Sequence, residues 1–326
     1  MKRILVTGGA GFIGSNLVNH LLGRGDTAVT VYDNFCVGRR EHLAKWSANP
    51  NLTVVEGELA DGKRLQAATV GHDMVFHFAA NADIAKSASE PRVDFANGTM
   101  LTESVLEAMR LANVRRIVFT SGSGVFGDVP PTPLPEDYSP LIPVSTYGAS
   151  KLASETLISA YCHMFDFTGT VVRFANVVGA NMTHGVSHDF IARLVVDPSR
   201  LLIYGDGEQT KPYIHVEDVI QAMLTADQAA SSGYSYYNVS SQDQLKVREI
   251  ADIVIEAMGL KDVRREFTGG RRGWRADVPV YSLNTTKIRR LGWSNRRNSA
   301  EAVKAAVESR LVEIGYRSPT DTQPAG

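Results

Sequence analysis

Two side chains capable of acid–base chemistry lie four residues apart in the segment S-T-Y-G-A-S-K. On a helix, Tyr147 and Lys151 would share one face, because residues four apart are neighbours there. Tyrosine ordinarily has a pKa of about 10, and a lysine ammonium beside it favours the phenolate. We therefore expect Tyr147 to be a general base assisted by Lys151. Because this spacing is also a common chance pairing, its interpretation depends on the surrounding motifs.

A glycine-rich turn near the N-terminus provides that setting. The segment T-G-G-A-G-F-I-G at 7–14 follows a predicted strand and precedes a helical pattern of leucines. Gly8 permits a tight turn, Gly11 lets the backbone approach a pyrophosphate, and Gly14 lets strand and helix pack closely. The helix N-terminus would then face the phosphates. This strand–turn–helix pattern predicts a dinucleotide-binding site.

An acidic residue at the end of the second predicted strand indicates which dinucleotide binds. Asp33 follows the glycine turn by about twenty residues and can accept hydrogen bonds from a ribose diol. Its charge would repel the 2′-phosphate of NADP, so we predict NAD as the cofactor. Arg39 and Arg40 could reach a phosphate, but we favour solvent-facing positions for them in a polar loop. The other residues expected to bind the cofactor are Phe12, Ile13, Asn34, Glu58, Leu59, Phe78, Ala79 and Ala80, and we expect His77 to be packed in the interior.

The elements that must position these residues follow from an alternation of short β-branched runs with helical patterns. This alternation is typical of a parallel sheet covered by helices on both faces. Right-handed crossovers then give an α/β, Rossmann-type, doubly wound sheet of about seven strands. A helix is predicted at 247–258, ending at Gly259. The seven strands are predicted at 4–8, 28–33, 52–57, 73–79, 116–121, 170–175 and 236–240.

Beyond residue 176 the alternation of strand and helix patterns gives way to loops and shorter elements, which indicates a second, smaller α/β domain for the substrate. We expect the NAD-binding domain to comprise residues 1–176, with 213–240 returning to it. The substrate-binding domain would comprise 177–212 and 241–316. The final segment, 317–326, is polar and contains proline, so we expect a flexible tail.

Composition excludes several classes of partner. The 326 residues are 44% hydrophobic and carry a formal net charge of −1. The protein therefore has no net positive potential that would attract the phosphates of a nucleic acid. Two cysteines, without partners at ligand spacing, suit a reducing compartment and give no sign of a metal site. No apolar run is long enough to span a bilayer. We expect a cytoplasmic protein that binds neither membrane nor nucleic acid.

Together these motifs resemble the extended short-chain dehydrogenase/reductases that act on nucleotide sugars, particularly the UDP-glucose 4-epimerase-like group. Five further segments carry the resemblance along the chain: H-F-A-A at 77–80, R-F-A-N-V-V-G at 173–179, L-I-Y-G-D-G-E-Q at 202–209, Y-I-H-V-E-D-V at 213–219 and R-R-G-W-R-A-D-V-P at 271–279.

The resemblance implies that Asn176, Lys211 and Arg272 bind a nucleotide-diphosphate sugar in a cleft between the domains. It also implies a homodimer formed through two helices per subunit, here within 100–112 and 149–163.

The chain departs from the family pattern at two places. Lys211-Pro212 stands where relatives have Arg followed by Asp. A lysine ammonium, which is a point charge, thus replaces a guanidinium that could bind a phosphate through two hydrogen bonds. Gly122 stands where a catalytic Ser or Thr is usual. The next two positions, Ser123 and Gly124, lack the Asp-Glu pair of family dehydratases and the Glu of related decarboxylases. Without an acid to protonate a leaving hydroxyl, dehydration is poorly supported.

We therefore expect NAD-dependent epimerisation of a nucleotide-diphosphate sugar, most simply at C4 through a transient 4-keto sugar. Ser123 would donate or relay the hydrogen bond that Gly122 cannot, while Ser121 would be packed beneath the site. A 4-ketoreductase using the same residues remains an alternative. A dinucleotide-binding regulatory protein without catalysis is another, favoured by Gly122 and opposed by the Tyr147–Lys151 pair.

Overall fold

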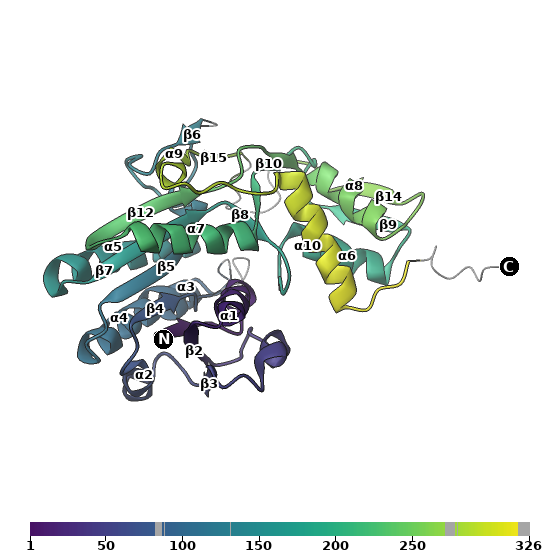
Figure 1. The fold of residues 1–326 in the computed structure, drawn as a ribbon. Helices are drawn as coiled ribbons and strands as arrows, with labels where there is room; N and C mark the ends of the chain where they lie inside the picture. The colour runs from purple at the N-terminus through teal and green to yellow at the C-terminus, as the bar shows by residue number, and fades with distance from the viewer. Residues whose placement is uncertain (82–86, 88, 131, 271–277, 279, 319–326) are drawn as a thin grey trace.

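The centre of the protein is a seven-stranded sheet in which every neighbouring pair is parallel (Figure 1). The computed structural model describes residues 1–318 except 82–86, 88, 131, 271–277 and 279. Each predicted strand corresponds to one strand of this sheet, which confirms the fold class. In spatial order they are β12 (Gly233–Val239), β7 (Thr168–Phe174), β5 (Arg116–Gly122), β4 (Met74–His77), β1 (Lys2–Thr7), β2 (Thr27–Asp33) and β3 (Leu52–Glu56).

The order of the strands reverses between β1 and β4, so the chain winds outward in both directions from this point. In such sheets ligands bind beyond the carboxyl ends of the strands at the reversal. The strand β4 is shorter than predicted, because its continuation turns to pack on the glycine turn. There the Phe78 backbone N–H donates to the Thr7 carbonyl over 3.1 Å.

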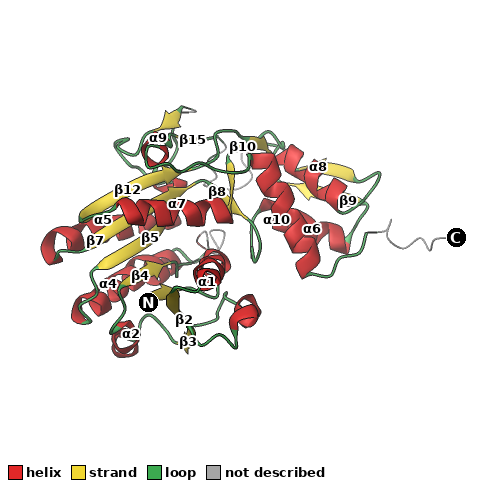
Figure 2. Cartoon of the chain, in the orientation of Figure 1, coloured by secondary structure: helices red, strands yellow, loops and turns green. Residues whose placement is uncertain are grey.

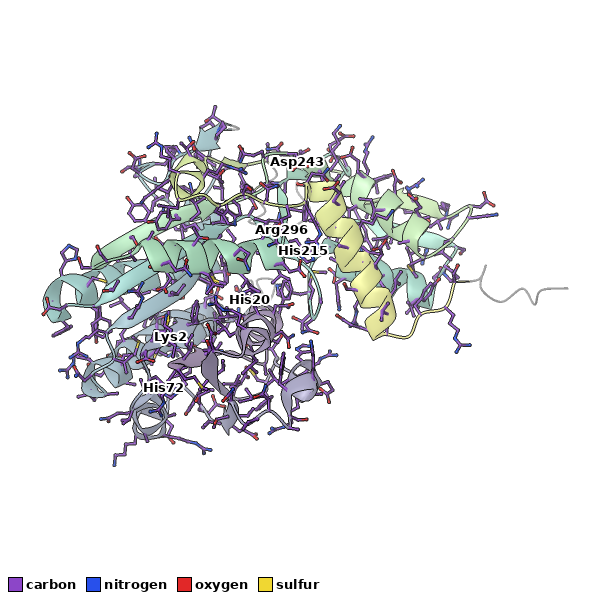
Figure 3. All side chains as sticks on the ribbon, viewed as in Figure 1. Lys2, His20, His72, His215, Asp243 and Arg296 are labelled. Carbon is purple, nitrogen blue, oxygen red and sulfur yellow. The ribbon has the colours of Figure 1, made fainter. Side chains whose placement is uncertain are left out.

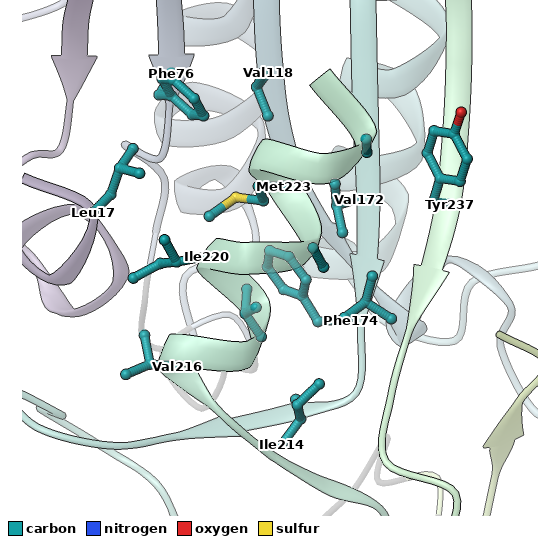
Figure 4. Packing of buried hydrophobic residues seen from close by; sticks show 14 of the residues in the cluster. Leu17, Phe76, Val118, Val172, Phe174, Ile214, Val216, Ile220, Met223 and Tyr237 are labelled. Carbon is teal, nitrogen blue, oxygen red and sulfur yellow. The ribbon is translucent and has the colours of Figure 1, made fainter. Parts of the chain in front are cut away.

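Helices cover both faces of the sheet (Figure 2). Along β5, Val118 packs in one apolar core with α1 (Phe12–Arg24) and α7 (Val216–Ala229), as seen in Figure 4. The next residue, Phe119, packs in the opposite core with α4 (Leu101–Leu111) and α5 (Thr146–Phe165). This alternation follows from the two-residue period of a strand.

A separate core lies beyond the sheet, on the right of Figure 1. It is built by α6 (Val186–Val196), α8 (Val247–Ala257) and α10 (Ser299–Glu313), with β9 (Arg200–Ile203) paired to β14 (Arg264–Phe267). The predicted helix at 247–258 is confirmed, and Gly259 follows it with φ +65°. The helix α10 has no counterpart among the predicted elements.

Two short strands connect the two cores. β8 (Asn176–Val178) pairs in parallel with β11 (Tyr213–His215), after which α7 and β12 carry the chain back to the main sheet. Figure 3 labels His215 and Arg296 near this connection, together with His20 of α1. Burial, followed by the charges of Arg24 and Arg296, lowers the pKa of His20.

The remaining elements are short. They are η1 (Arg40–Trp46), α2 (Gly62–Thr69), α3 (Arg92–Asp94), the π-helix η3 (Phe95–Met100), η4 (Ser123–Val125), β6 (Pro133–Leu134), β10 (Thr210–Lys211), β13 (Leu245–Lys246), β15 (Ser282–Leu283) and α9 (Thr286–Arg289). Among the helices in the described part of the chain, none has the length and apolar character that crossing a bilayer requires.

Candidate active site

The glycine turn brings three backbone segments into direct contact. Gly8 has φ +68°, and a Cβ placed on it would lie 2.7 Å from the backbone nitrogen of Ala79. A Cβ on Gly14 would lie 2.2 Å from the Gly8 carbonyl oxygen. Side chains at these two positions would force β1, α1 and the segment after β4 apart. The turn therefore presents bare backbone at the reversal point of the sheet.

The N-terminus of α1 is prepared to bind an anion. Its N-cap is Gly11, which contributes no capping side chain, and the first turn contains no acidic residue. The first N–H groups of a helix have no intrahelical partners, so those in the first turn, where Phe12 and Ile13 lie, are available to a phosphate. This arrangement fits a dinucleotide pyrophosphate.

Asp33 is fixed beside the turn by two backbone hydrogen bonds. It is 7% exposed, and its carboxylate accepts from the N–H groups of Ala10 and Phe35, each over 2.9 Å. A carboxylate has further lone pairs that can accept from a ribose diol. Arg40 forms an ion pair with Glu56, and its guanidinium lies 4.1 Å from the ring centroid of Phe35. These contacts hold Arg40 on the surface, as expected.

A hollow of about 450 Å³ lies next to Asp33, at the ends of β2 and β3. Two predicted cofactor residues form part of its wall, where Asn34 Nδ2 donates to both carboxylate oxygens of Glu58 over 3.2 and 3.0 Å. Leu59 is buried behind them. The hollow continues the line from the glycine turn through Asp33, which suits the adenosine end of a dinucleotide.

The predicted catalytic pair sits on α5 against the end of β5. The helix starts after Ser145, whose side chain accepts a hydrogen bond from the Gly148 N–H over 3.0 Å. One turn further on, Lys151 Nζ donates to the carbonyl of Thr120 over 2.9 Å and lies 5.7 Å from the ring centroid of Tyr147. The helix thus holds both side chains over β5.

The surroundings shift the pKa values of this pair in opposite directions. Burial lowers the pKa of Lys151 to about 8, although the charges of Glu155 and Asp94 oppose the shift. Burial and the negative charge of Asp94 raise the pKa of Tyr147 to about 12. With these pKa values, and with no cofactor bound, both the Tyr147 hydroxyl and the Lys151 amine are mainly protonated at neutral pH. An added positive charge beside the ring would lower its pKa toward the range of a general base.

At the end of β5, Gly122 leaves room for a side chain. Gly122 has extended backbone, and a Cβ on it would meet no heavy atom of the described residues closer than 3.9 Å. A Cβ on Gly124 would lie 3.9 Å from Tyr147 Cδ1, so this loop borders the tyrosine. Ser123 is half-buried between the two glycines. Ser121 is 3% exposed, and its hydroxyl has no hydrogen-bond partner within the described ranges.

His77 has a structural environment. Its two ring nitrogens lie 2.7 Å from Thr7 Oγ1 and 3.2 Å from Thr102 Oγ1. Burial, with the charge of Lys151, lowers the pKa of His77 to about 3, so the ring is neutral. This agrees with the expectation of a packed histidine.

The residues expected to bind the substrate are only partly described. Asn176 begins β8 beside the end of the sheet, and its buried Nδ2 has no hydrogen-bond partner in the portion of the chain that the structure describes. Its backbone N–H donates to Pro212 O over 3.3 Å, which places it close to half-buried Lys211. Arg272 and most of the predicted tail, 319–326, lie outside the described residues.

Sequence reasoning missed three polar residues at this site. Asp94 is 2% exposed and accepts hydrogen bonds from Asn81 Nδ2 over 2.8 Å and from Thr146 Oγ1 over 2.7 Å. Thr146 directly precedes the predicted base. Asp94 belongs to no motif, so the helical start P-R-V-D gave no signal of a role beside Tyr147.

Comparison with known proteins decides the family. Residues 4–240 match the model of the NAD dependent epimerase/dehydratase family. The chain belongs to this family. It is 32% identical to the UDP-glucose 4-epimerase of Mycolicibacterium smegmatis over 312 residues, covering 94% of this chain and 97% of that protein.

Solved structures of this epimerase/dehydratase family have the same architecture. A UDP-galactose 4-epimerase is 38% identical, with a TM-score of 0.85 over 96% of this chain and 99% of its own. A dTDP-glucose 4,6-dehydratase from Streptomyces venezuelae, solved with NAD bound, is 29% identical, with a TM-score of 0.86 over 97% and 99% of the two chains.

The family resemblance inferred from the motifs is thus confirmed, and so is NAD as the cofactor. The chain is an enzyme of the nucleotide-sugar epimerase/dehydratase family. Its own residues fit the cofactor, since bare glycine backbone and the α1 N-terminus could receive a pyrophosphate and Asp33 could accept from a ribose.

Proposed function

We propose that this enzyme is an NAD-dependent 4-epimerase of a nucleotide-diphosphate sugar. The observation that carries the proposal is the Tyr147–Lys151 pair beside a β5 loop in which Ser123 and Gly124 supply no carboxylic acid. A dehydratase must protonate a leaving hydroxyl, which requires such an acid. Oxidation and reduction at one carbon require only a base and a hydrogen-bond donor.

In this reaction Tyr147 removes the proton from the C4 hydroxyl of the sugar, and Lys151 stabilises the phenolate. When bound, NAD would supply hydride-acceptor and hydride-donor chemistry at C4, so that the sugar is oxidised to the 4-keto form and reduced again on its opposite face, and Tyr147 gives the proton back to the C4 oxygen. Ser123 hydrogen-bonds the C4 oxygen, in place of the hydroxyl that Gly122 lacks.

Binding of the substrate uses the junction between the two cores. We assign the diphosphate to Lys211 and the unpartnered amide of Asn176, with Arg272 as a further cation from the family pattern. The division expected from the sequence, with 1–176 and 213–240 for NAD and 177–212 and 241–316 for substrate, is part of this proposal.

Two other functions use the same residues. A 4-ketoreductase would deliver hydrogen once and consume a reduced cofactor in each turnover. A regulatory protein would bind NAD without turnover, which Gly122 favours. The Tyr147–Lys151 pair, with Lys151 held by the carbonyl of Thr120, supports catalysis instead.

The test is to incubate purified enzyme with UDP-, ADP-, CDP-, GDP- and dTDP-sugars without added cofactor. We expect two epimers of one nucleotide sugar to interconvert, as followed by the NMR signals of the anomeric protons, while bound NAD is retained. Consumption of one added NADH or NADPH per product would support the ketoreductase. Absence of turnover with every sugar would support the regulatory protein.

We also propose a cytoplasmic homodimer. Apolar side chains are exposed on the two helices expected to pair, with Leu111 of α4 at 51% and Met164 of α5 at 70%, and Met100 just before α4 at 51%. Light scattering coupled to size-exclusion chromatography should give twice the 35.5 kDa chain mass. A single-chain mass would contradict the dimer.

A further inference from the structure

Asp94 connects three segments that the chain brings to the catalytic pair from different directions. Its carboxylate binds Asn81, in the loop after β4, through Oδ1 and Thr146, in the first turn of α5, through Oδ2. Its backbone carbonyl accepts from Ser150 Oγ over 2.7 Å. The segment that leads from β4 to Asn81 begins with Phe78 and Ala79, which pack on the glycine turn.

The helix that follows Asp94 is shaped to fit closely against α5. The residues after Asp94 form the π-helix η3, an irregularity that occurs frequently at functional sites. Within it, a Cβ on Gly98 would lie 2.2 Å from Ser150 Oγ, and Thr99 Oγ1 lies 3.0 Å from the same oxygen. Asp94 is thus held rigidly against the turn of α5 that carries Tyr147.

The carboxylate is also an unusual group to bury here. Within the described part of the chain, the hydrogen bonds to its carboxylate oxygens come from neutral donors, an amide and a hydroxyl. Removing a carboxylate from water costs free energy, so a buried one often marks a functional site. Its charge acts on both members of the catalytic pair, since it raises the pKa of Tyr147 and opposes the lowering of that of Lys151.

Other charged groups near the pair come from neighbouring elements. Lys151 lies on the same helix as Tyr147, and Glu155 follows one turn later but is ion-paired with Arg173 over 2.6 Å. His77, on β4, is neutral because its pKa is about 3. Among the described residues, Asp94 is the negative charge that acts on the Tyr147 hydroxyl.

We propose that Asp94 is a positioning residue of the active site, whose carboxylate joins the cofactor loop to the start of α5 and places a fixed negative charge beside Tyr147. The inference rests on the proposed role of Tyr147 as the base. It predicts that the charge of Asp94, separately from its hydrogen bonds, makes Tyr147 harder to ionise. When the cofactor binds, its positive charge would favour the phenolate of Tyr147, while the negative charge of Asp94 would continue to disfavour it.

Two variants separate charge from hydrogen bonding. Asp94→Asn removes the charge, keeps the size of the side chain and leaves one oxygen able to accept. Thr146→Val removes the hydroxyl donor but leaves the carboxylate. Ionisation of Tyr147 is followed by NMR of NAD-loaded enzyme labelled with ¹³C at tyrosine Cζ, and its signal is assigned by its absence in Tyr147→Phe.

We expect Asp94→Asn to move the titration midpoint of Tyr147 to lower pH by about 0.5–1 unit, because a nearby like charge has been removed. The rising limb of the pH–rate profile should move in the same direction. Thr146→Val should leave the midpoint unchanged or raise it. If Asp94→Asn does not fold, Asp94→Ser replaces it in the same titration.

An unchanged midpoint in the charge-removing variant would overturn the proposal, because Asp94 would then act through packing alone. An equal downward movement in Thr146→Val would overturn it too. The titration needs no substrate, so it also separates this inference from the proposed function. A shifted midpoint in an enzyme that turns over no nucleotide sugar would support the role of Asp94 and contradict epimerisation.

Discussion

Restoring a hydroxyl at residue 122 is the sharpest perturbation that the structure offers. The backbone of Gly122 is extended, with φ −164°, a conformation open to any residue. Among the described residues, the nearest heavy atom to an added Cβ is the Phe174 carbonyl oxygen at 3.9 Å, which is an ordinary contact distance. We therefore expect Gly122→Ser to fold normally and to place its hydroxyl at the end of β5, in the loop that borders Tyr147.

The size of the effect follows from the strength of one hydrogen bond. A neutral hydrogen bond contributes about 0.5–1.5 kcal/mol, and one to a charged group about 1.5–3 kcal/mol. Because about 1.4 kcal/mol changes a rate tenfold, loss of the Ser123 hydroxyl should lower kcat about ten- to a hundredfold. Gly122→Ser in the Ser123→Ala background should regain most of that loss. In the wild-type background the gain should be smaller, since Ser123 already donates.

The assay compares kcat for epimerisation in wild type, the two single variants and the double variant, each checked for bound NAD. Ser121→Ala is the matched control, because this buried side chain lies on the strand and should cost much less. A large loss in Ser121→Ala with full activity in Ser123→Ala would refute the assignment to Ser123. Failure of Gly122→Ser to rescue Ser123→Ala would refute the reasoning about the space beside Gly122.

Three further changes test other parts of the site. Tyr147→Phe should retain bound NAD but lower kcat about 10²–10⁴-fold, because only the base is removed; wild-type turnover would contradict its role. Gly14→Ala should abolish NAD retention after purification, since its Cβ would lie 2.2 Å from a carbonyl oxygen, whereas Gly23→Ala on the same helix meets nothing within 4 Å and should retain NAD. Glu155→Gln should lower the free energy of unfolding by about 3–5 kcal/mol, because it leaves buried Arg173 unpaired; an unchanged midpoint in a urea titration would contradict this.

The central sheet could be predicted closely because its signals are local. The inner strands, buried on both faces, appear as short β-branched runs, and turns separate these runs from helical patterns. The helix α10 was missed because its buried positions include small residues such as Ala302 and Ala306. Such residues give little contrast with the exposed ones, so no apolar stripe marks the helix in the sequence.

The sequence by itself determined the dinucleotide turn, the Tyr147–Lys151 spacing, the lack of an acid at the two positions after Gly122, and the family. These features depend on residue types within a single segment or on short motifs in order. They therefore do not require knowledge of how the chain folds back on itself.

Only the tertiary structure decided what surrounds the catalytic pair. Lys151 is held by the carbonyl of Thr120, a Cβ on Gly122 would make only an ordinary contact among the described residues, and Asp94 reaches Thr146 and Asn81. These partners lie far apart in the chain and meet because parallel strands bring their carboxyl ends to one edge, where the loops and helix termini converge. A hydrogen bond and an electrostatic interaction depend on distance in space, and the order of residues along the chain does not specify that distance.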